Sequence, residues 1–125
     1  MEKTFEQKLA EAKQNVISIS PEQANSHKSS DSEVIFIDPR DAEDIKATTG
    51  IIPGALNVSL NDLNELKLDE FPVELADQSR VIITACQAGP MGALAAHALK
   101  KRGYDNVQFI DGGTQGWIDA GFSTH

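Results

Sequence analysis

The fold is decided by residues 81–101, which read VIITACQAGPMGALAAHALKK. The apolar run Val81–Ala85 is typical of a strand that is buried on both faces. The Ala-rich stretch from Gly92 to Lys101 has the composition and spacing of a helix, and Gly103 follows it as a helix-ending residue. Cys86 stands between the strand and the helix and is followed by a short loop of small and turn-forming residues.

Strand and helix patterns alternate along the rest of the chain. Apolar runs predict strands at 16–19, 34–37 and 107–110, and a Pro-Gly turn within 51–58 leads into a further short strand. The helical patterns lie at 21–27, within 38–47, at mixed spacing over 60–76, and after residue 113, whereas 28–33 is predicted as a loop. Strands joined by helices imply right-handed crossovers. We therefore expect one α/β domain, with a mostly parallel sheet of about four or five strands and helices on both faces.

The N-terminal residues predict an amphipathic helix. Phe5, Leu9, Ala12 and Val16 recur at three- and four-residue steps, with charged residues between them. This pattern predicts a helical extension over residues 1–15 that packs on the domain at 16–125. The segment Ser20–Gln23 then offers an N-cap serine, a proline in the first turn and a glutamine at the third helical position.

Composition excludes several classes of function. The chain has 125 residues, 11 Lys and Arg against 19 Asp and Glu, and a formal charge of -8, which argues against nucleic acid or an anionic membrane as the partner. The first residues do not read as a secretory signal, and no apolar run approaches the length of a membrane span. Cys86 is the only cysteine, so we expect no internal disulfide and a reducing, cytoplasmic location.

Cys86 lies where α/β proteins bind ligands, outside the carboxyl end of a strand. In the loop that follows, backbone N–H groups can turn inward beside a helix N-terminus and so stabilise an anionic sulfur. A buried, inert cysteine is the alternative, because free cysteines are often buried. The order of strand, cysteine, tight loop and helix favours a functional thiol.

Residues from about 17 to 122 resemble the single-domain rhodanese family of sulfurtransferases. Several short motifs carry this resemblance, in the family's order and at plausible separations. They are Ile19–Glu22, Ile37–Arg40 with Glu43, Gly50–Val58, the loop Cys86–Met91, Gly103–Val107, and Asp111–Gly113 through Trp117 to Gly121.

The resemblance implies that Cys86 takes sulfur from a donor such as thiosulfate, holds it as a persulfide, and passes it to cyanide or a cellular thiol. It also implies that no cofactor or metal is required, and that the partners are a small sulfur donor or a protein persulfide and a thiol acceptor. The substrate-binding loop would comprise Gln87, Ala88, Gly89, Pro90, Met91 and Gly92. Asp38 and Arg40 would support it, chiefly as a charge pair that fixes the neighbouring loop.

The loop departs from the family pattern because it contains no basic residue, so we expect weak binding of thiosulfate. Related phosphatases end a longer loop with an arginine, whereas this chain has Gly92 at that place. His97 reads as a packing or surface residue, and His27 and His125 have no metal-ligand spacing. Trp117, Leu94 and Leu99 read as core. A non-catalytic rhodanese-type module for protein interaction or sulfur relay stays open as the alternative function.

Overall fold

The computed structural model describes residues 3–30, 33–88 and 90–125. Within these residues, five strands form one parallel sheet in the order β1-β5-β4-β2-β3. The two edge strands are short and partly exposed, whereas the central strands are almost completely buried. The bounds are Ile17–Ile19 for β1, Ile35–Asp38 for β2, Leu56–Asn57 for β3, Ile82–Thr84 for β4 and Val107–Ile110 for β5.

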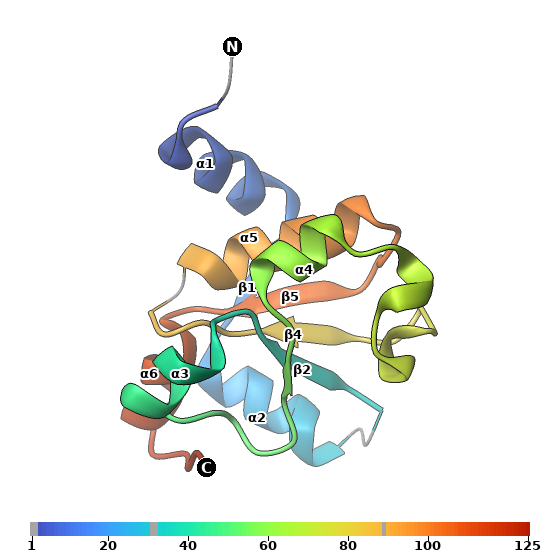
Figure 1. The fold of residues 1–125 in the computed structure, drawn as a ribbon. Helices are drawn as coiled ribbons and strands as arrows, with labels where there is room; N and C mark the ends of the chain where they lie inside the picture. Colours follow the sequence, from blue (N-terminus) through green and yellow to red (C-terminus); the bar gives the residue numbers. More distant parts are fainter. Residues whose placement is uncertain (1–2, 31–32, 89) are drawn as a thin grey trace.

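Helices cover both faces of this sheet, as the sequence predicts (Figure 1). On one face lie α1 (Phe5–Asn15), α4 (Leu60–Glu65) and α5 (Pro90–Lys101). On the other lie α2 (Pro21–Ser30), α3 (Ala42–Ala47) and α6 (Gly113–Asp119). Short 3-10 helices at Leu68–Glu70 and Val73–Leu75 connect α4 to β4. Thus α5, which follows β4, covers one face, whereas α3 and α6, which follow β2 and β5, cover the other (Figure 1).

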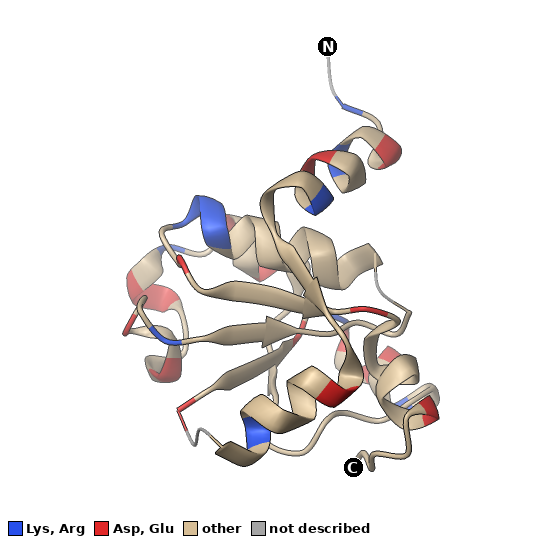
Figure 2. Cartoon of the chain, turned by 180° about the vertical axis from the view of Figure 1, so that it is seen from behind, with Lys and Arg blue, Asp and Glu red and all other residues tan. Residues whose placement is uncertain are grey.

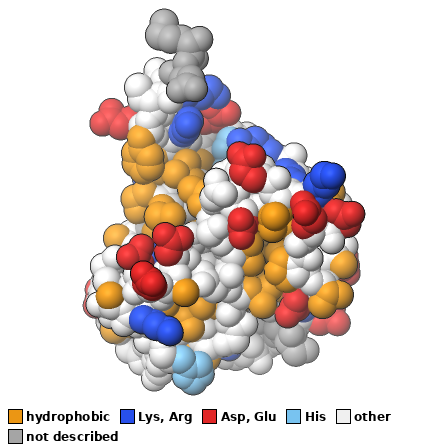
Figure 3. Space-filling model, viewed as in Figure 1, with side chains coloured by type: hydrophobic (Ala, Val, Ile, Leu, Met, Phe, Trp, Pro, Cys, Tyr) orange, Lys and Arg blue, Asp and Glu red, His pale blue; other side chains and the backbone are white. Residues whose placement is uncertain are grey.

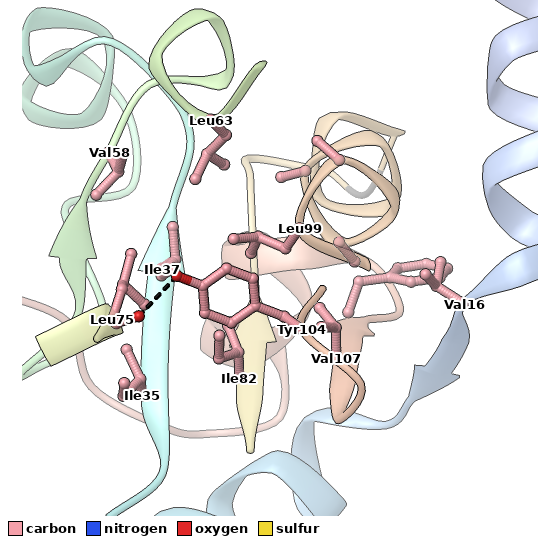
Figure 4. Close-up of a cluster of buried hydrophobic side chains, with 14 of the residues drawn as sticks. Val16, Ile35, Ile37, Val58, Leu63, Leu75, Ile82, Leu99, Tyr104 and Val107 are labelled. Atoms are coloured by element: carbon pink, nitrogen blue, oxygen red, sulfur yellow. Dashed lines mark hydrogen bonds between the residues drawn. The ribbon is translucent and has the colours of Figure 1, made fainter. Parts of the chain in front are cut away.

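The sheet divides the hydrophobic core into two clusters. The larger one lies under α1, α4 and α5 and includes Leu99 and Tyr104, whose hydroxyl donates to the carbonyl of Leu75 at 2.6 Å (Figure 4). The smaller one lies on the other face and is closed by Trp117, which contacts Phe36 edge-on. Trp117 and Leu99 are both core residues, as predicted, but they belong to opposite faces of the sheet.

Two helix boundaries differ from the prediction. α2 continues to Ser30, whose hydroxyl donates to the carbonyl of Ser26 at 2.7 Å, so residues 28–30 are helical and not loop. α5 begins at Pro90, two residues before the predicted start at Gly92. Proline suits the first helical turn because its missing N–H would have had no partner there.

The N-terminal helix is packed on α5. Ala12 is fully buried and Val16 nearly so, and Leu9 packs against the same cluster. The Lys100 ammonium donates to the carbonyl of Asn15 at 2.7 Å and so holds the end of α1 in place. The predicted N-cap forms at Ser20 for α2, where Gln23 completes the reciprocal pair of bonds. Thr4 caps α1 in the same way with Gln7, which the sequence analysis did not identify. Among the described helices, none is long and apolar enough to cross a membrane.

Candidate active site

Cys86 lies two residues after the end of β4, at the carboxyl edge of the sheet. Cys86 is only 3% exposed, whereas the next two residues, Gln87 and Ala88, are exposed. Below the loop, the Thr84 hydroxyl donates to the carbonyl of Gly92 at 2.6 Å and fastens the start of α5 to the strand. The strand, cysteine, loop and helix thus follow one another as the sequence predicts, with the cysteine at the base of the loop.

The first turn of α6 is hydrogen-bonded to this loop. The Thr114 N–H donates to the carbonyl of Cys86 at 2.7 Å, and the Gln115 N–H donates to that of Gln87 at 2.9 Å. Gly113 makes this approach possible because a Cβ there would lie 2.7 Å from the Cys86 carbonyl oxygen, and its φ is +63°. The pair Gly112–Gly113 indicates a close approach, and at Gly113 the structure identifies the partner as the cysteine loop.

These bonds engage the carbonyls of Cys86 and Gln87. The N–H groups of Gln87 and Ala88 donate to no other residue in the described part of the chain. Because the carbonyls of Cys86 and Gln87 are bonded to α6, the N–H groups of Gln87 and Ala88 are the donors that this segment can offer to an anion. The loop can therefore hold a negatively charged group without a side-chain cation.

The six predicted loop residues fall into different environments. Pro90 and Met91 belong to the first turn of α5, and Gly92 is buried against the backbone of Ala85 and Cys86. Gly89 lies outside the described residues. The segment available as an exposed loop is therefore shorter than the sequence predicts, because α5 begins at Pro90.

Asp38 and Arg40 form the ion pair that their spacing indicates. Arg40 Nη2 lies 2.7 Å from Asp38 Oδ2 and Nε lies 3.0 Å from Oδ1, with both side chains about 5% exposed or less. The guanidinium also donates to the hydroxyls of Thr48 and Thr49 and to the carbonyl of Gly50. Arg40 is thus committed to the β2–β3 connection and offers little free donor capacity to an anionic ligand.

Three further polar residues surround this ion pair, and the sequence analysis singles out neither Thr48 nor Thr49. Thr48 and Thr49 complete the shell of Arg40, and Asn57 donates to the carbonyls of Asp38 and Arg40 at 3.1 and 2.6 Å. The position of Asn57 on β3, directly beside β2, brings its side-chain amide to the end of the neighbouring strand.

Hollows flank the cysteine loop on two sides. One, of about 370 Å³, is bordered by Ala88 and Pro90 together with Lys13 and Asp111. The other, of about 190 Å³, is bordered by Met91, Arg40 and Asp41. Both hollows lie near the start of α5, which follows β4 and covers one face of the sheet. The helices α3 and α6, which follow the neighbouring strands β2 and β5, cover the other face, and ligands of open α/β sheets usually bind at such a point.

A larger groove of about 820 Å³ runs between α1, α4 and α5. Phe5, Met91 and Leu94 give it apolar walls, and Figure 3 shows hydrophobic side chains gathered where α1 meets the rest of the molecule. His97 also lines it, and partial burial lowers the pKa of this histidine, with nearby Lys101 acting in the same direction. In residues 3–30, 33–88 and 90–125, no three His, Cys, Asp or Glu side chains are grouped so that they could hold a metal ion.

Comparison with known proteins places the chain in a family. The family model described as Rhodanese-like domain matches residues 20–120. Thiosulfate sulfurtransferase GlpE of Shewanella oneidensis is 33% identical over 87 residues, which are 70% of this chain and 78% of that protein. A 42-residue stretch is 45% identical to Protein HIGH ARSENIC CONTENT 1, mitochondrial, of Arabidopsis thaliana, covering 34% of this chain and only 25% of that protein.

Among solved structures, a Rhodopseudomonas palustris protein of unknown function, described as a possible tyrosine phosphatase, superposes with a TM-score of 0.85 at 27% identity. The match covers all of this chain and 96% of that one. The similarity therefore includes the N-terminal helix, which lies before the residues that match the family model.

Proposed function

Because the chain belongs to the rhodanese-like domain family, we propose that it is a sulfurtransferase that carries sulfane sulfur on Cys86. The observation that carries this proposal is the position of Cys86 at the start of a loop in which the carbonyls of Cys86 and Gln87 are bonded to α6, while the N–H groups of Gln87 and Ala88 stay available. The similarity to a thiosulfate sulfurtransferase over 70% of the chain supports the same chemistry.

The reaction has two displacements at sulfur. In the first, the Cys86 thiolate attacks the outer sulfur of the donor. With thiosulfate, the new S–S bond forms as the bond to the sulfite group breaks, and sulfite leaves with the electron pair. In the second, cyanide or a thiolate attacks the outer sulfur of the Cys86 persulfide, and Cys86 leaves again as a thiolate. The enzyme thus alternates between two covalent forms, which predicts ping-pong kinetics.

The loop stabilises both forms in the same way. Thiolate and persulfide are both anions, and preorganised N–H groups in a partly buried site bind an anion without reorganising. The neighbouring groups fit a displacement at sulfur better than hydrolysis of a phosphate ester. Gly92 stands where related phosphatases have the arginine that grips the phosphate, and Arg40 is engaged by Asp38 and two threonines.

The physiological donor follows from the charges around the loop. Residues 87–92 carry no basic side chain, and the chain as a whole has a charge of -8, so a dianion gains no long-range attraction. We propose that thiosulfate binds weakly, and that a less highly charged donor, such as a protein persulfide, serves as well or better. A reactive thiol of this kind suits a reducing compartment such as the cytoplasm.

Steady-state turnover tests the proposal. Wild-type protein is supplied with thiosulfate, or alternatively with an inorganic polysulfide, and with cyanide, and the release of thiocyanate is measured. We expect turnover with parallel double-reciprocal plots, a high KM for thiosulfate, and no turnover in the Cys86→Ser variant. A folded wild-type protein that turns over neither donor would instead support the non-catalytic module.

A further inference from the structure

The pocket beside Ala88 and Pro90 carries one charge of each sign. Lys13, in the last turn of α1, and Asp111, directly after β5, both line it. Ser18 of the edge strand β1 lines it as well. Figure 2 shows the basic segment in the last turn of α1 from behind the molecule. A pocket of about 370 Å³ is large enough for a small organic molecule.

The last turn of α1 is held firmly enough to place Lys13 reproducibly. Ala12 on one side of Lys13 is fully buried, Val16 is 7% exposed, and the carbonyl of Asn15 accepts a hydrogen bond from Lys100. Lys13 also precedes residues 20–120, which match the family model. Its position beside the loop is therefore a feature of the N-terminal helix of this chain.

Both charges are available to a ligand. The Lys13 and Asp111 side chains are exposed at the pocket wall, and within the described part of the chain neither makes an ion pair or a side-chain hydrogen bond. A dianion would be attracted by Lys13 and repelled by Asp111. A zwitterion, with a carboxylate for Lys13 and an ammonium for Asp111, matches both groups.

We propose that this pocket binds a small zwitterionic thiol, of the α-amino-acid type, as the sulfur acceptor. The proposal rests on the function proposed above. Lys13 holds the carboxylate, Asp111 holds the ammonium, and the thiol sulfur reaches the loop past Ala88 and Pro90. The acceptor thiol first loses its proton to solvent. Its thiolate then attacks the outer sulfur of the Cys86 persulfide, a new S–S bond forms, the bond to Cys86 breaks, and Cys86 leaves with the electron pair.

Single-turnover discharge of the Cys86 persulfide tests the pocket. The persulfide form is mixed with cysteine, cysteamine, 3-mercaptopropionate or 2-mercaptoethanol, and rates are compared at equal thiolate concentration. We expect cysteine to be fastest. Lys13→Gln and Asp111→Asn should each lower its rate roughly twofold to fivefold, the range for one exposed charge pair, without changing the rate with neutral 2-mercaptoethanol. Lys8→Gln, on the same helix but facing the groove to α4, is the matched control and should behave as wild type.

A binding measurement separates this inference from the function on which it rests. S-methylcysteine has the same two charges but no thiol, so its binding, followed by calorimetry, does not require Cys86 to carry sulfur. Saturable binding that is weakened several-fold in Lys13→Gln and in Asp111→Asn supports the pocket even if persulfide formation fails. Absence of that binding, or discharge by cysteine that neither variant slows, overturns the inference while leaving the chemistry of Cys86 intact.

Discussion

Arg40 shows how a single buried residue organises the end of β2. Its guanidinium donates hydrogen bonds to Asp38, Thr48, Thr49 and the carbonyl of Gly50. Its own carbonyl accepts a hydrogen bond from Asn57 of β3. The ion pair could be predicted from the spacing of Asp38 and Arg40. Its threonine partners could not, because they lie eight and nine residues away in a connection whose path is set by tertiary packing.

Loss of the Arg40 guanidinium should therefore be costly. Arg40→Met leaves the Asp38 carboxylate buried without its partner, and we expect the free energy of unfolding to fall by about 3–5 kcal/mol. Arg80→Met is the control, because the Arg80 side chain donates to the carbonyl of Glu33 at an exposed position, and its loss should cost about 1 kcal/mol. Urea unfolding of the two variants measures both values, and equal small losses would contradict a structural role for Arg40.

His97 predicts a pH dependence of stability. Burial lowers its pKa below the ordinary 6.5 in the folded protein, while Glu11 opposes this shift and Lys101 adds to it. Below about pH 6.5, His97 therefore binds a proton more readily in the unfolded chain than in the folded chain. The free energy of unfolding consequently falls as the pH falls. The decline in unfolding free energy from about pH 7.5 to 5.5 should be smaller in His97→Gln than in wild type. Identical declines would show that His97 titrates alike in both states.

At the scale of elements, the contact between the cysteine loop and α6 positions the candidate nucleophile. β4, α5 and α6 are each identifiable from local patterns, and Gly112–Gly113 indicates a close approach. The residues that meet there, Cys86 and Thr114, are separated by a strand and a helix, so their hydrogen bond depends on the order of strands in the sheet. No local pattern contains that order.

A substitution at Gly113 tests this contact. In Gly113→Ala, the new Cβ would meet the Cys86 carbonyl oxygen at 2.7 Å, so the loop must shift, and we expect sulfur transfer to fall at least tenfold. Gly121→Ala is the matched control, since φ there is +96° but no atom lies within 4 Å of the new Cβ. It should cost about 1 kcal/mol of stability through backbone strain alone and keep full activity. Equal activity in the two variants would show that the α6 contact does not position Cys86.

At the scale of the whole molecule, the alternation of strand and helix patterns predicts the α/β class and the parallel sheet. The strand order and the placement of Leu99 and Trp117 on opposite faces do not follow from this alternation. Both depend on which face of the sheet is covered by the helix between each pair of strands. The proximity of Lys13 to Ala88 is a tertiary feature in the same sense. The division of the chain into an extension at 1–15 and a domain at 16–125 stays a prediction.

The central claim is that Cys86 accepts sulfur, and the intact mass of the protein tests it most directly. After incubation with thiosulfate or polysulfide and removal of excess donor, wild-type protein should gain the mass of one sulfur atom and lose it again on addition of cyanide. Cys86→Ser, which is nearly isosteric, should keep the wild-type circular dichroism spectrum and gain no mass. Unchanged wild-type mass with every donor, or an equal gain in Cys86→Ser, would contradict the account.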